Sequence, residues 1–466
     1  MITENQFIKL KELSMRGSMQ SLKNIINIFT LDDFQTFSLA CAYILERAVI
    51  SLDTGLGKTL VAGGLINLDI SGSRWLFVVK NNNLLQTATK LRSIVNDDRV
   101  VQYSSGTVEQ ITYLIQNCRS NAVILITYDT LNNLDFLNYI FTIRNTFIGI
   151  IVDESHNIGN KGSNRSEMLK HMMRNCFRYQ YMLTATPLSI DPFQIVNQIN
   201  MIDQELVPDP EELAMHYTCY QNGKVTGYHN LDELAHHISM RYISFTRAEL
   251  GLKGNYNLKL WLCDTPEDCE VPDNKDKLRM VKRYADNACV NKVVELVEFY
   301  KRLGLRGLIY ANLTEYKDML LEQLKDICSV AILDGRVSSI DKRRIQQEFN
   351  TGKYTVLISN LEEGQDLPCE FIIFYELSVR YKQFIGRGER GLSGRDLEIH
   401  FVMVDKSYEV EFFYRNIYKR SLLLEMLCKK DVSEIKEIAK QLDKALSSDS
   451  RQDMEVFNSI YLDTDL

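Results

Sequence analysis

The sequence predicts an α/β protein built from two tandem, doubly wound parallel-sheet domains, with a small helical linker or insertion between them and a helical C-terminal appendage. Three observations lead to this prediction. Short apolar runs alternate with helical patterns, the runs fall into two series of five, and each run is apolar on both faces. Such runs are typical of parallel strands that helices cover on both sides. The 466 residues, 45% of them hydrophobic, are enough for two to four domains.

The first series of apolar runs predicts the strands of a domain over residues 1–192. Its members are AVISL, RWLFVVK, NAVILITY, FIGIIVD and YQYMLT, at residues 48–52, 74–80, 121–128, 147–153 and 179–184. The second series predicts a domain over residues 289–405. Its members are RGLIYA, SVAILD, TVLISN, FIIFYEL and LEIHFVMV, at residues 306–311, 329–334, 355–360, 371–377 and 397–404.

Helix signals separate the runs of the second series. Ser338, followed three residues later by Asp341, predicts a capped helix start between two of its strands.

Two further regions lack the alternating pattern. Residues 193–288 are helical and irregular with an acidic loop, and we expect a linker with a small helical insertion. Residues 406–466 are charged and helical and end in an acidic tail. We expect an appendage there, which offers a surface for a protein partner that loads the molecule.

Composition limits where the protein works and what it binds. The chain has 54 Lys and Arg against 61 Asp and Glu, so its formal net charge is −7 and any nucleic-acid site must be local. Its ten cysteines form no C-x-x-C pair and no zinc-ligand spacing. The N-terminus has no signal-peptide pattern, and no apolar run is long enough for a membrane helix. We expect a soluble, intracellular protein in a reducing compartment, with no membrane partner.

The stretch SLDTGLGKT, residues 51–59, predicts a phosphate-binding loop. It follows a predicted strand and opens a predicted helix. In such a loop, glycines turn backbone N–H groups toward a phosphate, the lysine reaches the β and γ oxygens, and the next hydroxyl binds Mg²⁺. The candidate residues are Thr54, Gly55, Leu56, Gly57, Lys58 and Thr59, with Thr59 as the Mg²⁺ ligand. The strict pattern begins with glycine where Leu52 stands, so the match is the relaxed G-x-G-K-T form, and a capped turn in an unrelated α/β protein is the alternative.

The stretch IIVDESHN predicts a pair of carboxylates at the carboxyl end of a buried strand. Ligands bind at that edge of open α/β sheets. Asp153 would hold Mg²⁺, partly through water, and Glu154 would orient or deprotonate the attacking water. A solvated acidic turn is the alternative for a D-E pair taken alone.

Taken in order, these and further motifs resemble the superfamily 2 helicases and translocases over residues 31–405. DESH resembles the D-E-x-H box, LTATP the third motif and ILITYDTL motif Ib, while SNLEEGQDLP resembles motif V and QFIGRGER fits Q-x-x-G-R-x-x-R of motif VI. LDDFQ places a glutamine upstream of the loop, as the family does. The resemblance implies two RecA-like domains that hold ATP and Mg²⁺, and an ATP hydrolase that depends on nucleic acid.

The resemblance also implies roles for individual residues. Gln35 would read the adenine edge, Arg387 and Arg390 would stabilise charge on the transferring phosphoryl group, and Thr184 and Thr186 would couple the ATP site to movement. Solvated surface positions are the alternative for the arginines, and strand-end caps for the threonines. Further nucleotide contacts are expected from Gly364, Asp366 and Gln383. Nucleic-acid contacts are expected at motif edges, where a plain loop residue is the alternative at each position: Lys80, Thr127, Tyr128, Asn312, Ser359 and Asn360.

Within this superfamily the chain looks most like the Swi/Snf-type double-stranded DNA translocases. LDTGLGKT is close to their D-E-M-G-L-G-K-T loop, and MRYISFTRAEL resembles their arginine-containing strand after the linker. The compact size resembles a viral or phage form, which would work in the cytoplasm of a host cell or in a virion. We therefore expect an ATP-dependent DNA translocase or helicase that favours double-stranded DNA. An RNA helicase acting on transcripts and a non-hydrolysing assembly subunit are the alternatives, and none of the catalytic positions is degraded.

Overall fold

The protein forms two compact units that the chain enters more than once. The computed structural model describes residues 31–69, 71–96, 99–104, 106–158, 164–188, 193–221, 224–247, 249–252, 256–263, 288–360, 367–379, 381–389, 396–404, 408–428, 430 and 432–447. Within them, the first unit runs to Leu250 and also includes residues 423–428 and 430. The second unit runs from Gly251 to Leu422 and resumes at Val432.

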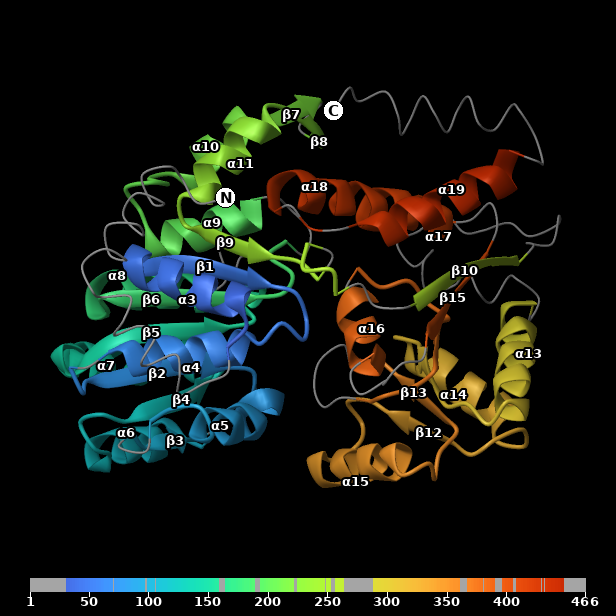
Figure 1. Cartoon of the computed structure of the whole chain (residues 1–466), viewed down its shortest axis with the longest axis horizontal. Helices are drawn as coiled ribbons and strands as arrows, with labels where there is room; N and C mark the ends of the chain where they lie inside the picture. The colour runs from blue at the N-terminus through green and yellow to red at the C-terminus, as the bar shows by residue number, and fades with distance from the viewer. Residues whose placement is uncertain are drawn as a thin grey trace. The chain divides into compact units, whose positions relative to one another are not determined.

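The first unit is built on a seven-stranded parallel sheet, coloured from blue to green in Figure 1. The five predicted strands are confirmed as β1 (Arg47–Leu52), β2 (Arg74–Val79), β4 (Val123–Thr127), β5 (Phe147–Asp153) and β6 (Tyr179–Thr184). Two short strands, β3 (Val101–Tyr103) and β9 (Tyr242–Phe245), complete the order β3-β4-β2-β5-β6-β1-β9.

Helices cover both faces of this sheet, which explains why its strands are apolar throughout. In β1, Val49 enters the core on one face and Ile50 the core on the other, and both are fully buried. One core takes its helical residues from α3 (Asp33–Leu45), α4 (Lys58–Leu68) and α5 (Leu84–Arg92). The other takes them from α6 (Val108–Asn117), α7 (Leu134–Thr142), α8 (Asn164–Cys176), α9 (Phe193–Ile202), α11 (Leu231–Ser239) and the end of a later helix, α18 (Lys419–Cys428). A short helix, α10 (Pro210–His216), and a hairpin of β7 (Thr218–Gln221) and β8 (Lys224–Tyr228) lie between α9 and α11 in the chain.

The second unit repeats this arrangement with a six-stranded parallel sheet of order β10-β15-β14-β11-β13-β12. The predicted strands are confirmed as β11 (Gly307–Tyr310), β12 (Val330–Leu333), β13 (Val356–Ser359), β14 (Phe371–Phe374) and β15 (Leu397–Val404), and β10 (Tyr256–Cys263) is added at one edge. In β11, Leu308 and Ile309 enter opposite cores, so this sheet is also covered on both faces.

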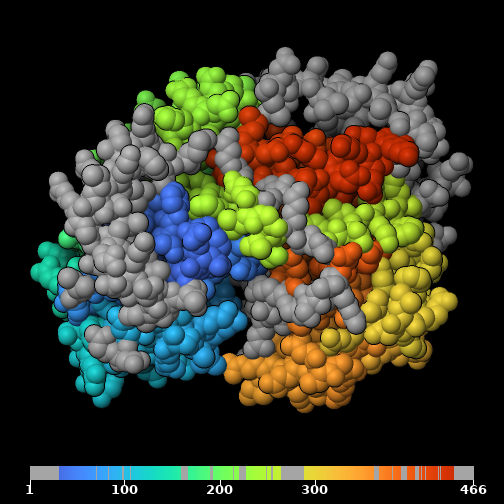
Figure 2. Space-filling view, in the orientation of Figure 1, coloured from blue at the N-terminus to red at the C-terminus, as the bar shows by residue number. Residues whose placement is uncertain are grey.

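The helices of the second unit are α13 (Ala288–Arg302), α14 (Thr314–Leu324), α15 (Ser339–Asn350), α16 (Tyr381–Glu389), α17 (Tyr408–Phe412), α18 (Lys419–Cys428), which continues into the first unit, and α19 (Ser433–Ser447). α15 begins at its predicted cap, because the Ser338 hydroxyl accepts a hydrogen bond from the Asp341 N–H at 3.1 Å. Figure 2 shows α13 in yellow and α15 in orange on the surface of this unit.

The described parts of the predicted linker and appendage belong to the two units themselves. α9 and β9 lie in the first unit, and β10 pairs with β15 in the second. Residues that follow β15, such as Phe413 and Ile435, are fully buried in a core of the second unit. The sequence pattern conceals β10 because this edge strand is only partly buried along most of its length, so it is not apolar on both faces. Residues 264–287 and 448–466, which include the acidic loop and the acidic tail, lie outside the described residues.

Among the helices that the structure describes, none is both long and apolar enough to span a bilayer. The nine cysteines in the described ranges carry free thiols, eight of them buried.

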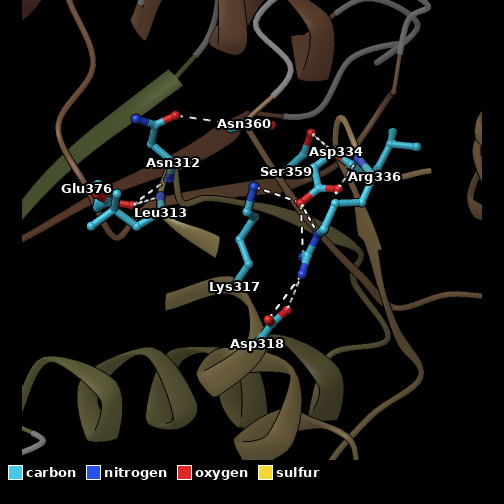
Figure 3. Close-up of polar contacts among 10 residues, drawn as sticks. Asn312, Leu313, Lys317, Asp318, Asp334, Arg336, Ser359, Asn360 and Glu376 are labelled. Atoms are coloured by element: carbon cyan, nitrogen blue, oxygen red, sulfur yellow. Dashed lines mark hydrogen bonds and ion pairs between the residues drawn. The ribbon is translucent and has the colours of Figure 1, made fainter. Parts of the chain in front are cut away.

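A buried ion pair ties α14 to the end of β12 in the second unit (Figure 3). Lys317 Nζ lies 2.7 Å from Asp334 Oδ2, and the two side chains are only 3% and 2% exposed. Arg336 also contacts Asp334, at 3.0 Å, and reaches the exposed Asp318 at 2.9 Å. Burial acts to raise the pKa of Asp334, but hydrogen bonds from Arg336 and Lys317 outweigh it and lower this pKa to about 2.

We predict that the Asp334 carboxylate stabilises the second unit by roughly 2 kcal/mol above pH 4. A lowered pKa in the folded state gives stability that is present above the unfolded pKa and is lost as the pH falls from about 4 toward about 2. Asp334→Asn also leaves Lys317 buried without its counter-ion, so at pH 7 we expect a loss of about 3 kcal/mol in urea denaturation. The difference from the natural protein should narrow below pH 4.

Asp318→Asn is the matched control for this prediction. Asp318 shares Arg336 with Asp334, but its side chain is 53% exposed, so its removal should cost less than about 1 kcal/mol. Equal losses for the two variants would contradict the assignment.

Candidate active site

The candidate site lies where three neighbouring strands of the first sheet end. β6 stands between β5 and β1 in the sheet. Ser51 of β1 is in register with Thr184 of β6, and Leu183 of β6 is in register with Asp153 of β5. The predicted phosphate loop, the carboxylate pair and the threonine motif therefore leave the sheet at the same edge, although the loop and the threonine motif lie more than 120 residues apart in the chain.

The loop between β1 and α4 has the backbone of an anion-binding turn. Gly55 and Gly57 have φ angles of 86° and 82°, in the left-handed region that glycine enters without steric cost. α4 begins at Lys58, as predicted, and its N-cap Gly57 supplies no side-chain cap for the first N–H groups of the helix. Backbone N–H groups at such a helix start favour a bound anion.

Lys58 lies over the loop that precedes it. Its Nζ donates a hydrogen bond to the carbonyl oxygen of Leu52, 3.2 Å away, at the end of β1. Thr54 and Thr59 are half-buried, Leu56 is buried and Gly55 is exposed. Lys58 and Thr59 are thus the first two residues of α4, and they follow directly on a glycine turn in which Gly55 is exposed.

Gln35 joins α3 to the phosphate loop. Its Oε1 accepts a hydrogen bond from the Asp32 N–H, and its Nε2 donates to the Leu56 carbonyl oxygen, both at 3.1 Å. The side chain is 5% exposed, and a Cβ atom on Gly57 would lie 2.4 Å from Gln35 Nε2. The structure therefore places Gln35 against the loop backbone, and Gly57 leaves room for that contact.

The carboxylate pair leaves β5 through a strained residue. Glu154 has a φ of 52°, and holding a residue other than glycine there costs about 1 to 3 kcal/mol. Its N–H donates to Asp153 Oδ1 at 3.0 Å, and the Tyr128 hydroxyl donates to the Asp153 carbonyl oxygen. These hydrogen bonds hold Asp153 at the end of β5, and the left-handed conformation of Glu154 ends the strand there.

His156 connects Glu154 with the threonine motif. The histidine is 2% exposed, and its Nδ1 lies 3.4 Å from Glu154 Oε2. The same nitrogen lies 3.2 Å from Thr184 Oγ1 and 3.4 Å from Thr186 Oγ1. The His156 ring therefore contacts both the predicted general base, Glu154, and the two predicted coupling threonines.

The histidine was not among the predicted site residues, although its position in DESH is the signal that could have identified it. A second link runs beside it. Ser155 Oγ donates to Gln198 Oε1 at 2.6 Å, and Gln198 Nε2 donates to the Pro187 carbonyl oxygen at 3.0 Å. No feature of the sequence pattern distinguishes Gln198 as a partner of this site.

The residues at this edge fit a triphosphate with Mg²⁺. The glycine turn and the uncapped helix start suit phosphate oxygens, and Lys58 supplies a cation. Thr59 and Asp153 offer the oxygen ligands that Mg²⁺ prefers, and Mg²⁺ usually takes one or two protein ligands beside phosphate and water. In the described ranges, no group of three or more His, Cys, Asp or Glu residues is placed to hold a metal ion without such help.

In the second unit, two of the predicted motif VI residues, Gln383 and Arg387, lie in α16. Arg387 is 1% exposed and Gln383 is 5% exposed. α16 lies close to β14, since a Cβ atom on Gly388 would be 2.7 Å from Cys369 Sγ and 2.9 Å from Ile372 Cδ1. Arg387 is therefore a buried side chain, not a solvated surface residue. Arg390, Gly364 and Asp366 lie outside the described residues.

Three of the predicted nucleic-acid residues serve internal hydrogen bonds. Ser359 is fully buried and donates to the Leu333 carbonyl oxygen at 2.8 Å (Figure 3). Thr127 and Tyr128 are both 4% exposed, and Thr127 Oγ1 lies 3.2 Å from Thr130 Oγ1. Their positions at strand ends put these hydroxyls in the core, where they satisfy carbonyl and hydroxyl partners.

The other three are more accessible. Asn312 is exposed, and Asn360 and Lys80 are half-buried. Asn312 and Asn360 follow the paired strands β11 and β13, and Asn360 Nδ2 donates to Asn312 Oδ1 at 3.4 Å (Figure 3). Glu376 holds this turn by accepting the N–H groups of Asn312 and Leu313.

Two family models match the chain, one in each unit. "Type III restriction enzyme, res subunit" matches residues 18–189, and "Helicase conserved C-terminal domain" matches residues 289–391. No curated protein sequence matches.

The chain is also similar to solved structures. The Pyrococcus furiosus Hef helicase domain is 15% identical in sequence to this chain, with a TM-score of 0.50. The match covers 81% of this chain and 97% of the Hef chain. The Sulfolobus solfataricus SWI2/SNF2 ATPase core in complex with dsDNA is 14% identical with a TM-score of 0.43, covering 89% and 97%. The two parallel sheets covered by helices, together with the likeness to the Hef helicase domain, confirm the predicted fold of two tandem RecA-like domains.

We predict that Gly57→Ala weakens binding of a non-hydrolysable Mg·ATP analogue at least about tenfold, an effect of roughly 1.4 kcal/mol. The added methyl group would collide with Gln35 and strain a left-handed turn. Isothermal titration calorimetry measures the affinity.

Gly72→Ala is the control for backbone strain. Gly72 has a φ of 66°, but nothing lies within 4 Å of the added Cβ. The Gly72→Ala variant should lose about 1 kcal/mol in its free energy of unfolding and keep its affinity for the ATP analogue. Unchanged binding by Gly57→Ala would show that the loop does not hold the nucleotide.

Proposed function

We propose that the protein is an ATP-dependent DNA translocase or helicase of superfamily 2, of the Swi/Snf-like type. The observation that carries this proposal is the common edge of β1, β6 and β5, where a left-handed glycine turn, a threonine pair and two acidic residues converge. The helicase-family matches in both units support a nucleic-acid-dependent ATPase.

The proposal gives each residue of the edge a step in ATP hydrolysis. The N–H groups of the loop and the Lys58 ammonium hold the phosphates, and Thr59 and Asp153 hold Mg²⁺. Mg²⁺ held there would neutralise negative charge on the phosphate groups. Glu154 orients the attacking water and accepts its proton. The left-handed backbone conformation of Glu154 supports this role, because strained residues of this kind cluster at active sites.

The second unit supplies the positive charge that the transition state needs. We assign this role to Arg387 and Arg390 of motif VI, with Gln383, Gly364 and Asp366 as nucleotide contacts. A guanidinium at the transferring phosphoryl group accelerates such reactions by about 10³ to 10⁵. The near-complete burial of Arg387 supports a fixed position for its side chain. Hydrolysis would then require both units to engage one nucleotide, so nucleotide state would control their motion.

His156 offers a path from hydrolysis to movement. Its Nδ1 lies within 3.4 Å of Glu154, Thr184 and Thr186, so a change at the glutamate alters the hydrogen bonds of both threonines. We propose that this relay reports the state of the γ-phosphate to the nucleic-acid contacts.

The nucleic-acid contacts in this proposal are few and local, because the chain carries a net charge of −7. Lys80, Asn312 and Asn360 are the accessible candidates, and they would grip phosphates without reading bases. The preference for double-stranded DNA rests on the likeness of the loop LDTGLGKT and of the segment MRYISFTRAEL to the Swi/Snf-type translocases.

We predict an ATPase activity that duplex DNA stimulates more than single-stranded DNA or RNA does. Lys58→Ala and Glu154→Gln should each lower the stimulated rate at least about 100-fold, since one removes a phosphate contact and the other the base. A coupled phosphate-release assay measures the rates.

Lys440→Ala, an exposed lysine of α19, should leave the rate unchanged. A rate that no nucleic acid changes would contradict the translocase proposal, and stronger stimulation by RNA than by DNA would favour an RNA helicase.

A further inference from the structure

We propose that Lys430 is a positioning residue of the phosphate loop. It belongs to residues 423–431, where the chain returns from the second unit to the first, and we call this stretch the return segment. By neutralising Asp53, Lys430 keeps the loop able to accept a triphosphate. This inference rests on the proposed ATP site and goes beyond it, since it makes a segment near the C-terminus part of nucleotide binding.

The return segment is docked on the first unit by apolar contacts. Leu423, Leu427 and Cys428 are buried in the core that also contains Tyr242 of β9. The Ser244 hydroxyl, also on β9, donates to the Cys428 carbonyl oxygen at 3.3 Å. β9 is the direct neighbour of β1, so the segment is held beside the strand that leads into the phosphate loop.

The end of the segment turns its lysine toward that loop. The Lys430 N–H donates to the Leu424 carbonyl oxygen at 3.2 Å, which closes the chain against the last turn of α18. Lys430 Nζ then lies 2.8 Å from Asp53 Oδ1 and donates to the Ser51 carbonyl oxygen at 3.2 Å. The lysine side chain is 6% exposed and the aspartate side chain 27% exposed.

Asp53 is the first residue of the loop after β1, and both of its oxygens are engaged. Lys430 takes Oδ1, and the Arg247 N–H donates to Oδ2 at 3.0 Å. The Arg247 guanidinium lies beside the same turn, since its Nη1 is 3.4 Å from the place of a Cβ on Gly55. Two segments remote in the sequence therefore fix the carboxylate that begins the loop.

The charge of Asp53 makes this arrangement matter for nucleotide binding. A carboxylate two residues before Gly55 repels phosphate unless a cation compensates it. Lys430 does so with little solvent between the charges, where screening by salt is weak. Its removal should therefore penalise ATP more than ADP, since ATP carries more negative charge at the loop. A purely structural anchor would show no such dependence on charge.

The test is equilibrium binding of a non-hydrolysable ATP analogue and of ADP to the full chain. We expect Lys430→Met to raise the Kd of the ATP analogue about tenfold, a change of roughly 1.4 kcal/mol, and that of ADP by less. In turnover, the KM for ATP should rise while kcat stays within about twofold. Lys430→Arg should keep most of the affinity, because it preserves the positive charge.

The double variant Asp53→Asn with Lys430→Met separates charge compensation from anchoring. It removes both charges, so the affinity for the ATP analogue should return to within about threefold of the natural protein. This variant also tests the inference if Lys430→Met alone fails to fold. Lys440→Met, an exposed lysine in α19, is the matched control and should bind normally.

Two results would overturn the inference: normal binding by Lys430→Met, or a double variant that still binds about tenfold more weakly than the natural protein. Failure of the natural protein to bind any nucleotide would instead contradict the proposed ATP site.

Discussion

The left-handed turn at Gly55 and Gly57 is the constraint on which the rest of the site depends. It lets the chain leave β1 and start α4 within a few residues, so that Lys58 and Thr59 are the first two residues of that helix. Because the N-cap residue is Gly57, no N-cap side chain bonds the first N–H groups of the helix, and these groups favour a bound anion. The parallel register of β1, β6 and β5 then brings Asp153, Thr184 and their neighbours to the same edge. A side chain at Gly57 would break this arrangement locally, because Gln35 occupies the space beside it.

Around this turn, charged and polar side chains are held by partners from distant parts of the chain. Gln35 of α3 donates a hydrogen bond to the Leu56 carbonyl oxygen. Asp53 accepts hydrogen bonds from the N–H of Arg247, which follows β9, and from Lys430 of the return segment. Although the chain is net acidic, it places Lys58, Arg247 and Lys430 at or beside the loop that would hold the triphosphate. On the other side of the edge, Glu154, Thr184 and Thr186 all lie within 3.4 Å of Nδ1 of the buried His156. In the proposed function, a change at the Glu154 carboxylate would alter the hydrogen bonds of the two threonines through this ring.

Most of the ten predicted strands could be found from the sequence because helices bury both of their faces, which leaves a continuous apolar run. The edge strand β12 is only partly buried, but all four of its residues are apolar. β3 is too short for such a signal, and β10 is a partly buried edge strand. The loop and the carboxylate pair could be found because their chemistry needs fixed residue types at fixed spacing. Lys430 could not, since 377 residues separate it from Asp53. Nor could the burial of Thr127 and Ser359, because a hydroxyl at a strand end looks the same in the sequence whether it faces the core or solvent.

The most direct test of the central claim is an experimental structure of the protein with Mg²⁺ and a non-hydrolysable ATP analogue. The account predicts that the phosphates lie in the turn of residues 53–57, with Thr59 and Asp153 directed to the metal ion and Lys58 Nζ moved from the Leu52 carbonyl oxygen to a phosphate oxygen. A nucleotide bound elsewhere, with Lys58 still on Leu52, would contradict it.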